Sequence, residues 1–307
     1  MNFYFKGKEG LKLSYVIGID SGGTHIVGQA LEKTGRVIFE TQSGPGNILL
    51  NQAQTYQNLT TILSTIFEQL DRRDCEHILV GIAGVETTNN AGEVATFLTA
   101  HFGVKTDVIS DAQLALLNGL EGQDGTLVIA GTGSVVYGRQ NKKMIRYGGW
   151  GFLLGDTGSA YQITASAMKE MLHQHDQQTA STLTQPLLAM LKAADVKQAV
   201  QIYYTLQRKD IAAFAVKIAE LAESGNAEAR QILTQQAYAL GDEVLGLYAH
   251  YQEPLPQRIA FSGSVLVHNT TFRQTLLSYI QQHYPEIRGH VVSTNNGRGA
   301  IFWEAWQ

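Results

Sequence analysis

The chain has 307 residues, which is long enough for two domains of about 150 residues each. Its hydrophobic content of 44% is ordinary for a globular protein, and its net charge of −4 gives no reason to expect nucleic acid or an anionic membrane as a partner. No apolar run approaches the roughly 20 residues that span a bilayer, so we expect no membrane partner either.

The first residues of the chain, its single cysteine and its histidines further restrict the class of protein. The first residues, MNFYFKGKEGLKLS, lack the continuous apolar core of a secretory signal; whether they are an added or a frayed natural extension stays open. The single cysteine, Cys75, excludes an intrachain disulfide, which fits a cytoplasmic protein. The nine histidines are scattered, and no Cys/His cluster has the spacing of a structural zinc site.

The first half of the chain predicts the order βββαβα. Residues 15–40 hold three apolar or alternating runs separated by the turn DSGGT (residues 20–24) and by a Thr-Gly turn. A Gly-Pro-Gly loop follows, and then apolar residues recur at helical spacing from Leu59 to Leu70. Residues 77–84 predict a buried strand, residues 89–102 a helix, and residues 105–110 a short strand that stops where the next helix begins, at Asp111.

The same order begins again at Thr126. The segment TLVIAGTGSVVYGRQNKKMIRYGG predicts three strands, with GTGS (residues 131–134) as the first turn and Asn-Lys-Lys as the second. Helices are expected over residues 160–172, 211–224, 227–251, 272–284 and 298–307, and strands over residues 258–262 and 289–294. This pattern predicts an α/β fold with largely parallel inner strands and an internal duplication.

We place the boundary between the two copies near residue 115. The expected domains are residues 14–115, with residues 294–307 packing back on them, and residues 116–293, which carry additional helices. Two glycine-bearing hairpins that face each other across a cleft could hold a polyphosphate, because such turns offer backbone N–H and hydroxyl donors. For each turn taken alone, an ordinary hairpin is the alternative.

Three segments resemble one known family: SDAQLALL (residues 110–117), GTGSVVYG (residues 131–138) and GGWGFLLGDTGSAY (residues 148–161). They are similar to the N-acetylglucosamine kinase branch of the BadF/BcrA-type ATPases, within the ribonuclease H-like superfold of actin, sugar kinases and Hsp70. The resemblance runs from Tyr15 to the C-terminus. It implies two domains flanking a nucleotide cleft, ATP-dependent phosphorylation of a sugar hydroxyl, a requirement for magnesium, and a homodimer.

Phosphoryl transfer needs positioned phosphates, a metal and a proton acceptor. We expect the turn after Asp20 to bind phosphate through Gly22, Gly23 and Thr24, and Asp20 to hold Mg²⁺, through water. The second phosphate turn comprises Gly131, Thr132, Gly133 and Ser134, with Thr132 as the principal hydroxyl donor.

The resemblance assigns the general base to Asp111. The alternative is that Asp111 caps the following helix. The two roles are compatible, and the helix N–H groups would tend to keep the carboxylate ionised.

Further residues match the family's sugar and adenosine contacts. The segment Gly149, Trp150 and Gly151 corresponds to a sugar-contacting loop, although a core tryptophan is the alternative for Trp150. Asp156 matches a sugar-binding carboxylate, with a helix cap as the alternative, and Asn47 matches a sugar-contacting asparagine, with an Asn-turn as the alternative. The adenosine contacts correspond to Gly263 and Ser264 and to Ala213, which replaces a frequent glycine and is small enough for a base to pack against.

Three possible functions differ in the residues that they require. The leading hypothesis is an ATP-dependent hexosamine kinase that makes N-acetylglucosamine 6-phosphate; glucosamine and N-acetylmuramate remain open as substrates. An ATPase that activates a partner dehydratase would hold an iron–sulfur cluster with several thiolates, and this chain has only Cys75. A nucleotide-binding sensor without catalysis would not need Asp111 as a base.

Overall fold

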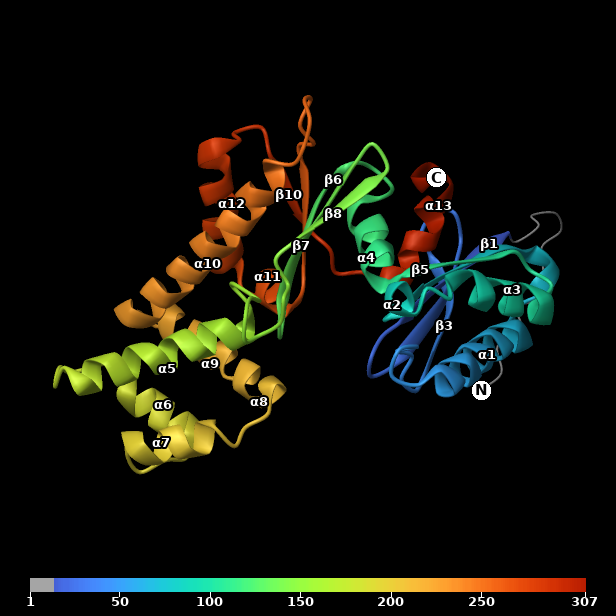
Figure 1. Ribbon diagram of the computed structural model, residues 1–307. Helices are drawn as coiled ribbons and strands as arrows, with labels where there is room; N and C mark the ends of the chain where they lie inside the picture. Colours follow the sequence, from blue (N-terminus) through green and yellow to red (C-terminus); the bar gives the residue numbers. More distant parts are fainter. Residues whose placement is uncertain (1–13) are drawn as a thin grey trace. The chain divides into compact units, whose positions relative to one another are not determined.

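The computed structural model describes residues 14–307 (Figure 1). The N-terminal stretch for which the sequence predicts no secretory signal lies outside the described residues. The chain divides into two compact units, one formed by Met1–Gln123 with Thr294–Gln307 and the other by Asp124–Ser293. The first unit ends later than residue 115, because a boundary there would cut through helix α4 (Asp111–Leu120).

The first unit is a five-stranded sheet covered by helices. The sheet has the order β3-β2-β1-β4-β5, in which β1 is antiparallel to β2 and parallel to β4. The elements are β1 (Tyr15–Ser21), β2 (Ile26–Leu31), β3 (Val37–Ser43), α1 (Gln52–Gln69), η1 (Arg72–Asp74), β4 (Cys75–Ile82), α2 (Val85–Thr88), α3 (Ala91–Phe102), β5 (Thr106–Ser110), α4, η2 (Asn296–Phe302) and α13 (Trp303–Trp306).

Alternation along β1 sends side chains to both faces of this sheet. Ile17 and Ile19 join a buried cluster with α1 and α3, while Val16 joins a second cluster with α4 and the C-terminal segment. Gly18 lies so close to η2 that a Cβ on it would come within 1.7 Å of Gly297 O. The C-terminal segment is therefore part of the first unit and packs directly on its central strand.

The second unit repeats this topology. Its sheet has the order β10-β9-β6-β7-β8, with β6 antiparallel to β7 and parallel to β9, just as β1 is to β2 and β4. The predicted duplication is confirmed. The elements are β6 (Gly125–Ala130), β7 (Ser134–Gln140), β8 (Lys143–Tyr147), α5 (Ala160–Asp176), α6 (Thr184–Leu191), α7 (Val196–Tyr203), α8 (Arg208–Ala213), α9 (Ala215–Glu223), α10 (Ala227–Tyr248), β9 (Arg258–Ser262), α11 (Ser264–His268), α12 (Thr270–His283) and β10 (Arg288–Val291).

The extra helices α5–α9 enlarge the second unit (Figure 1). The predicted single helix over residues 211–224 is two helices, because the Phe214 N–H bonds to Ile211 O in a tightened turn that separates α8 from α9. Helices α6 and α7 were not predicted. Among the helices of residues 14–307, none combines the length and apolar character needed to cross a membrane.

Candidate active site

The turn between β1 and β2 presents an open backbone. Ser21 pairs with Ile26 at the end of the ladder, and Gly22 N–H donates to His25 O at 3.1 Å. A Cβ on Gly23 would meet nothing within 4 Å, and Thr24 is exposed. The turn is therefore accessible to a ligand, as a phosphate role requires, and that role stays a prediction.

Asp20 lies next to this turn, near the end of β1. Asn296 Nδ2 donates to Asp20 Oδ2 at 3.0 Å. Burial raises the pKa of Asp20; the Asn296 hydrogen bond opposes this rise, and the charge of Asp111 adds to it. A cation would relieve both the desolvation and the repulsion between the two carboxylates.

The residues around Asp20 fit a magnesium ion only if water and substrate phosphates supply most of its ligands. In the described part of the chain, no group of three His, Cys, Asp or Glu side chains is arranged to hold a metal ion. Mg²⁺ is commonly held by one or two carboxylates together with water and substrate phosphates, and Asp20 can supply such a carboxylate.

Asp111 is the first residue of α4. The cap of this helix is Ser110, whose Oγ accepts from Gln113 N at 3.2 Å while Gln113 Oε1 accepts from Ser110 N at 3.0 Å. The alternative that Asp111 is the cap is therefore wrong, which leaves its carboxylate for another role.

Two opposing effects act on the pKa of Asp111. Its Oδ1 accepts from Ala112 N at 2.9 Å, and this helix N–H favours the ionised form, as the sequence predicts. Burial outweighs the hydrogen bond and raises the pKa of Asp111, and the charge of Glu86 adds to the rise. A carboxylate whose pKa lies above the ordinary Asp value is a better proton acceptor near neutral pH.

Asn47 is held by its own loop. Its Oδ1 accepts from Leu49 N at 3.1 Å and from Leu50 N at 3.3 Å, which is the Asn-turn that the sequence offered as the alternative. Gly46 N–H donates to Gly22 O at 2.8 Å, so the loop is attached to the turn between β1 and β2. A sugar contact, which stays a prediction, would fall to the Asn47 amide N–H₂ group.

The turn between β6 and β7 is more closely packed than its counterpart. Gly131 N–H donates to Gly133 O at 2.8 Å, and Gly131 O accepts from Ala160 N at 2.8 Å. A Cβ on Gly131 would lie 3.6 Å from Ser264 N, so the structure brings this turn to the Gly263 turn. Ser134 Oγ donates to Thr157 O at 2.7 Å and thereby joins the turn to the next loop.

Only glycine fits the backbone conformation and the space at position 263. Its φ is +87°, and a Cβ would come within 2.4 Å of Ala130 O. The chain passes from β9 into α11 beside β6 without any side chain between them.

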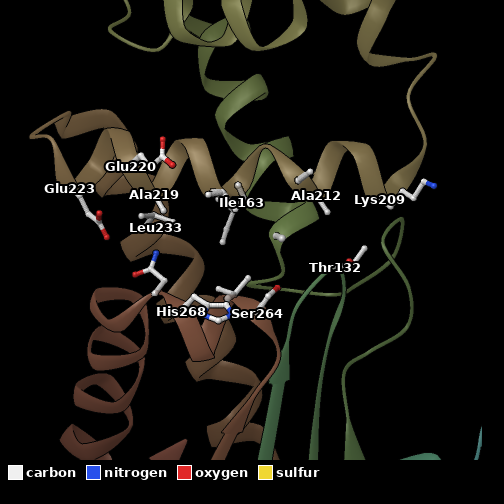
Figure 2. A pocket seen from close by; sticks show the side chains of 16 residues that line it. Thr132, Ile163, Lys209, Ala212, Ala219, Glu220, Glu223, Leu233, Ser264 and His268 are labelled. Atoms are coloured by element: carbon white, nitrogen blue, oxygen red, sulfur yellow. The ribbon is translucent and has the colours of Figure 1, made fainter. Parts of the chain in front are cut away.

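A cavity of about 450 Å³ opens in the second unit between these two turns and α8 and α9 (Figure 2). Thr132 and Ser264 lie on one side of it, and α8 and α9 lie across from them. The wall is mostly apolar, with carboxylates at one end. The lining residues are Thr132, Ala160, Ile163, Lys209, Ala212, Ala213, Ala215, Val216, Ala219, Glu220, Glu223, Leu233, Ser264, Val265, His268 and Asn269. Small side chains on α8 and α9 leave space for a flat ring, and the cavity is within the size range of small-ligand sites.

The loop after β8 exposes a tryptophan. Trp150 is 71% exposed, so the alternative of a core tryptophan is wrong. The Arg146 guanidinium lies over its ring, 4.7 Å from the centroid. Gly149 and Gly151 have φ values of +69° and +93°, which favour glycine and turn the chain on either side of Trp150.

Asp156 is the buried carboxylate of this loop. It is 3% exposed, and its Oδ1 accepts from Gly151 N at 3.1 Å. The cap of α5 is Ser159, whose Oγ accepts from Gln162 N, so the alternative of Asp156 as a helix cap is wrong.

The residue that sequence reasoning missed is Arg208. Its Nη2 donates to Asp156 Oδ2 at 2.6 Å across 52 positions of the chain, and no local pattern marks such a contact. Both residues line a second cavity of about 260 Å³ with Gly133, Ser134, Tyr137, Arg146, Gly149 and Gly151. Adjacent residues of one turn, Thr132 and Gly133, thus line the two cavities.

The two duplicated sheets define an α/β protein of the actin-like fold class. The chain belongs to the BadF/BadG/BcrA/BcrD ATPase family, which it matches over residues 17–301. Membership of an ATPase family identifies ATP as the nucleotide.

Several proteins to which the chain is similar are named as sugar kinases. The chain is 27% identical over 304 residues to N-acetylmuramic acid/N-acetylglucosamine kinase of Clostridium acetobutylicum, covering 94% of this chain and 97% of the relative. It is 27% identical over 293 residues to N-acetyl-D-glucosamine kinase of Dictyostelium discoideum, covering 88% and 91%. A crystal structure from Chromobacterium violaceum, provisionally named an N-acetylglucosamine kinase, superposes with a TM-score of 0.69 at 22% identity, covering 97% of this chain and 100% of that one. This last likeness shows the fold.

Proposed function

We propose that the protein is an ATP-dependent hexosamine kinase that transfers the γ-phosphoryl group of ATP to the 6-hydroxyl of N-acetylglucosamine. The observation that carries this proposal is the pair of cavities along the GTGS turn. One is mostly apolar, with a volume of about 450 Å³, and the other holds the buried carboxylate of Asp156 and borders the exposed Trp150 loop. The names of the relatives support the sugar class.

In the proposed reaction, different residues of this chain bind the nucleotide and the sugar. The Thr132 hydroxyl donates to phosphate oxygens, and the adenosine packs between Ser264 and Ala213. Asp156 accepts from a sugar hydroxyl, and Trp150 packs on an apolar face of the sugar ring. Aromatic packing together with a buried carboxylate suits a polyol, because each hydroxyl both donates and accepts.

Asp111 accepts the proton of the attacking hydroxyl. The bond between the γ-phosphorus and the β–γ bridging oxygen breaks and leaves its electron pair on ADP, while a bond forms between phosphorus and the sugar O6. The hydroxyl proton passes to the Asp111 carboxylate. When bound, Mg²⁺ at Asp20 would neutralise phosphate charge, and Asp20 would hold it together with water and phosphate oxygens.

A panel of sugars tests the function directly. Purified protein with Mg·ATP is offered N-acetylglucosamine, glucosamine, N-acetylmuramate and glucose, and ADP release and product mass are followed. N-acetylglucosamine should give the highest kcat/KM, with a product phosphorylated at the 6-position. If only glucosamine or only N-acetylmuramate is phosphorylated, that amino sugar is the substrate in place of N-acetylglucosamine. If no amino sugar is phosphorylated, the hexosamine kinase function is rejected.

The alternative of a dehydratase activator conflicts with the single thiol. Cys75 is buried in β4, and burial raises the pKa of its thiol to about 12. The thiol is therefore protonated at neutral pH, whereas an iron–sulfur cluster needs thiolates. An iron assay of the purified protein tests this alternative.

The proposal extends to assembly and location. From the family resemblance we propose a homodimer, and from the cysteine usage a cytoplasmic enzyme. Light scattering on the purified protein and fractionation of cells measure these two properties, and a monomer or a secreted product would contradict them.

A further inference from the structure

Arg208 lies where the two cavities of the second unit adjoin. It lines the smaller cavity with Gly133 and Asp156, while the next residue, Lys209, lines the nucleotide cavity with Thr132. A nucleotide whose base lies between Ser264 and helices α8 and α9, and whose phosphates reach the GTGS turn, would bring its terminal phosphate to this place.

The guanidinium of Arg208 is positioned by an ion pair and a neighbouring ring. Its Nη2 donates to Asp156 Oδ2 at 2.6 Å, and Asp156 Oδ1 accepts from Gly151 N at 3.1 Å. Its central carbon lies 5.5 Å from the centroid of the Phe152 ring. These contacts fix the guanidinium before any ligand binds, which is the condition for effective electrostatic stabilisation of a transition state.

The Arg208 guanidinium also lies against the GTGS turn, and it has N–H donors that the ion pair with Asp156 does not use. A Cβ on Gly133 would come within 2.2 Å of Arg208 Nη2 and 2.6 Å of Asp156 Oδ2, so only glycine admits the ion pair at this distance. Within residues 14–307, Arg208 Nε is buried without a hydrogen-bond partner. A guanidinium carries five N–H donors, and the bond to Asp156 uses one of them.

We propose that Arg208 is a catalytic residue that donates to the phosphoryl group in transit from ATP to the sugar, an inference that rests on the kinase function proposed above. As the γ-phosphorus leaves the bridging oxygen of ADP and bonds to the sugar O6, charge is spread over its three other oxygens. Arg208 stabilises that charge. Asp156 then has two tasks, to bind the sugar and to hold the guanidinium in place.

The first test compares Arg208→Gln with a matched ion pair. Arg139 Nη1 donates to Asp124 Oδ1 at 2.7 Å in the same unit, and neither residue lines a cavity described above, so Arg139→Gln removes a buried Arg–Asp contact without touching the site. Arg208→Gln should lower kcat by about 10²–10³-fold with the KM for ATP changed by less than about threefold. Arg139→Gln should leave kcat within about threefold of wild type.

Arg208→Lys, which keeps the charge and loses the planar fork, should lie between wild type and Arg208→Gln in kcat. A kcat of Arg208→Gln within tenfold of wild type, or a loss confined to the KM of the sugar, would overturn the proposal and leave Arg208 as a partner of Asp156 only.

A second test does not depend on sugar turnover. ADP with magnesium and aluminium fluoride imitates the phosphoryl group in transit, and calorimetry gives its affinity relative to ADP alone. Wild type should gain about a hundredfold or more from the fluoride, as transition-state analogues do. Arg208→Gln should bind ADP as wild type does and lose most of that gain.

The double variant Arg208→Gln/Asp156→Asn separates catalysis from folding. Arg208→Gln alone leaves a buried, unpaired carboxylate, and Asp156→Asn removes that charge, so the double variant should recover thermal stability. The double variant should still lack the gain in ADP affinity that wild type obtains from aluminium fluoride. A double variant that regains it would reject a role for Arg208, and this comparison decides the proposal even if no amino sugar is phosphorylated and the proposed function fails.

Discussion

Replacing Asp111 with asparagine removes the proposed proton acceptor and little else. The amide oxygen introduced by Asp111→Asn can still accept from Ala112 N, as Asp111 Oδ1 does at 2.9 Å, and the Ser110 cap keeps the start of α4 intact. The loss should therefore report proton transfer alone. General-base removal lowers the rate by about 10²–10⁴-fold, which corresponds to about 3–5 kcal/mol in the activation free energy.

Single-turnover measurements with saturating ATP and N-acetylglucosamine provide the assay, since they isolate the chemical step. Burial raises the pKa of Asp111, so the wild-type rate should fall on acidification at a pH above the ordinary Asp value of 3.8. The variant should lack this acid limb. A variant that keeps more than about a tenth of the wild-type rate would remove Asp111 from the mechanism.

The matched control for this prediction is Asp107→Asn. Asp107 lies on β5, the strand that leads to Asp111, but its Oδ2 accepts from Trp303 Nε1 at 3.0 Å and lies 2.8 Å from His77 Nε2. Asp107→Asn should lower thermal stability and keep the single-turnover rate. Asp111→Asn should do the opposite: a carboxyl group whose folded pKa is raised destabilises the fold as pH rises, so the variant should be at least as stable as wild type at pH 7.

Four further substitutions test the geometry and the electrostatics. Thr132→Val removes the proposed phosphate donor at constant volume and should raise the KM for ATP by about 5–150-fold, equivalent to about 1–3 kcal/mol, without changing the KM for sugar; unaltered ATP kinetics would return the turn to an ordinary hairpin. Gly18→Ala places a Cβ 1.7 Å from Gly297 O and should lower the free energy of unfolding by more than about 3 kcal/mol in urea titrations, whereas Gly23→Ala, with nothing within 4 Å, should change it by less than about 1 kcal/mol. Burial raises the pKa of Glu243 despite a hydrogen bond from Thr157, so Glu243→Gln should exceed wild type in unfolding free energy at pH 8 by a margin that shrinks toward pH 4.5; a margin independent of pH would contradict this.

Local signals predicted the duplicated fold. Strand alternation, glycine turns and helical spacing are all encoded within a few neighbouring residues, so the repeat of βββαβα was visible at Tyr15 and again at Thr126. The long helix expected over residues 211–224 failed for a related reason. The break at Phe214 has no Gly or Pro, and apolar spacing alone does not reveal a tightened turn there.

Contacts between distant segments could not be predicted. The sequence marks Asp156 through its resemblance to a family motif, but its partner Arg208 lies 52 positions away in a segment without a recognised pattern. The exposure of Trp150 is equally non-local, since a tryptophan between glycines is compatible with a core or a surface. The rise in the pKa of Asp111 depends on burial by packed elements, whereas the helix N–H groups that argue for a fall are local.

The two glycine turns show how duplication can produce unlike sites from one pattern. In the first unit, Gly23 faces open space and the neighbouring groups are carboxylates, Asp20 and Asp111, which repel each other. In the second, added helices pack against the turn, and Gly133 touches Arg208. In the proposed function, the first unit thus supplies carboxylates for a cation and a proton, and the second supplies a cavity for the base and cationic side chains for phosphate. Because the base-sized cavity lies wholly within the second unit, ATP affinity should survive Asp111→Asn even where turnover does not.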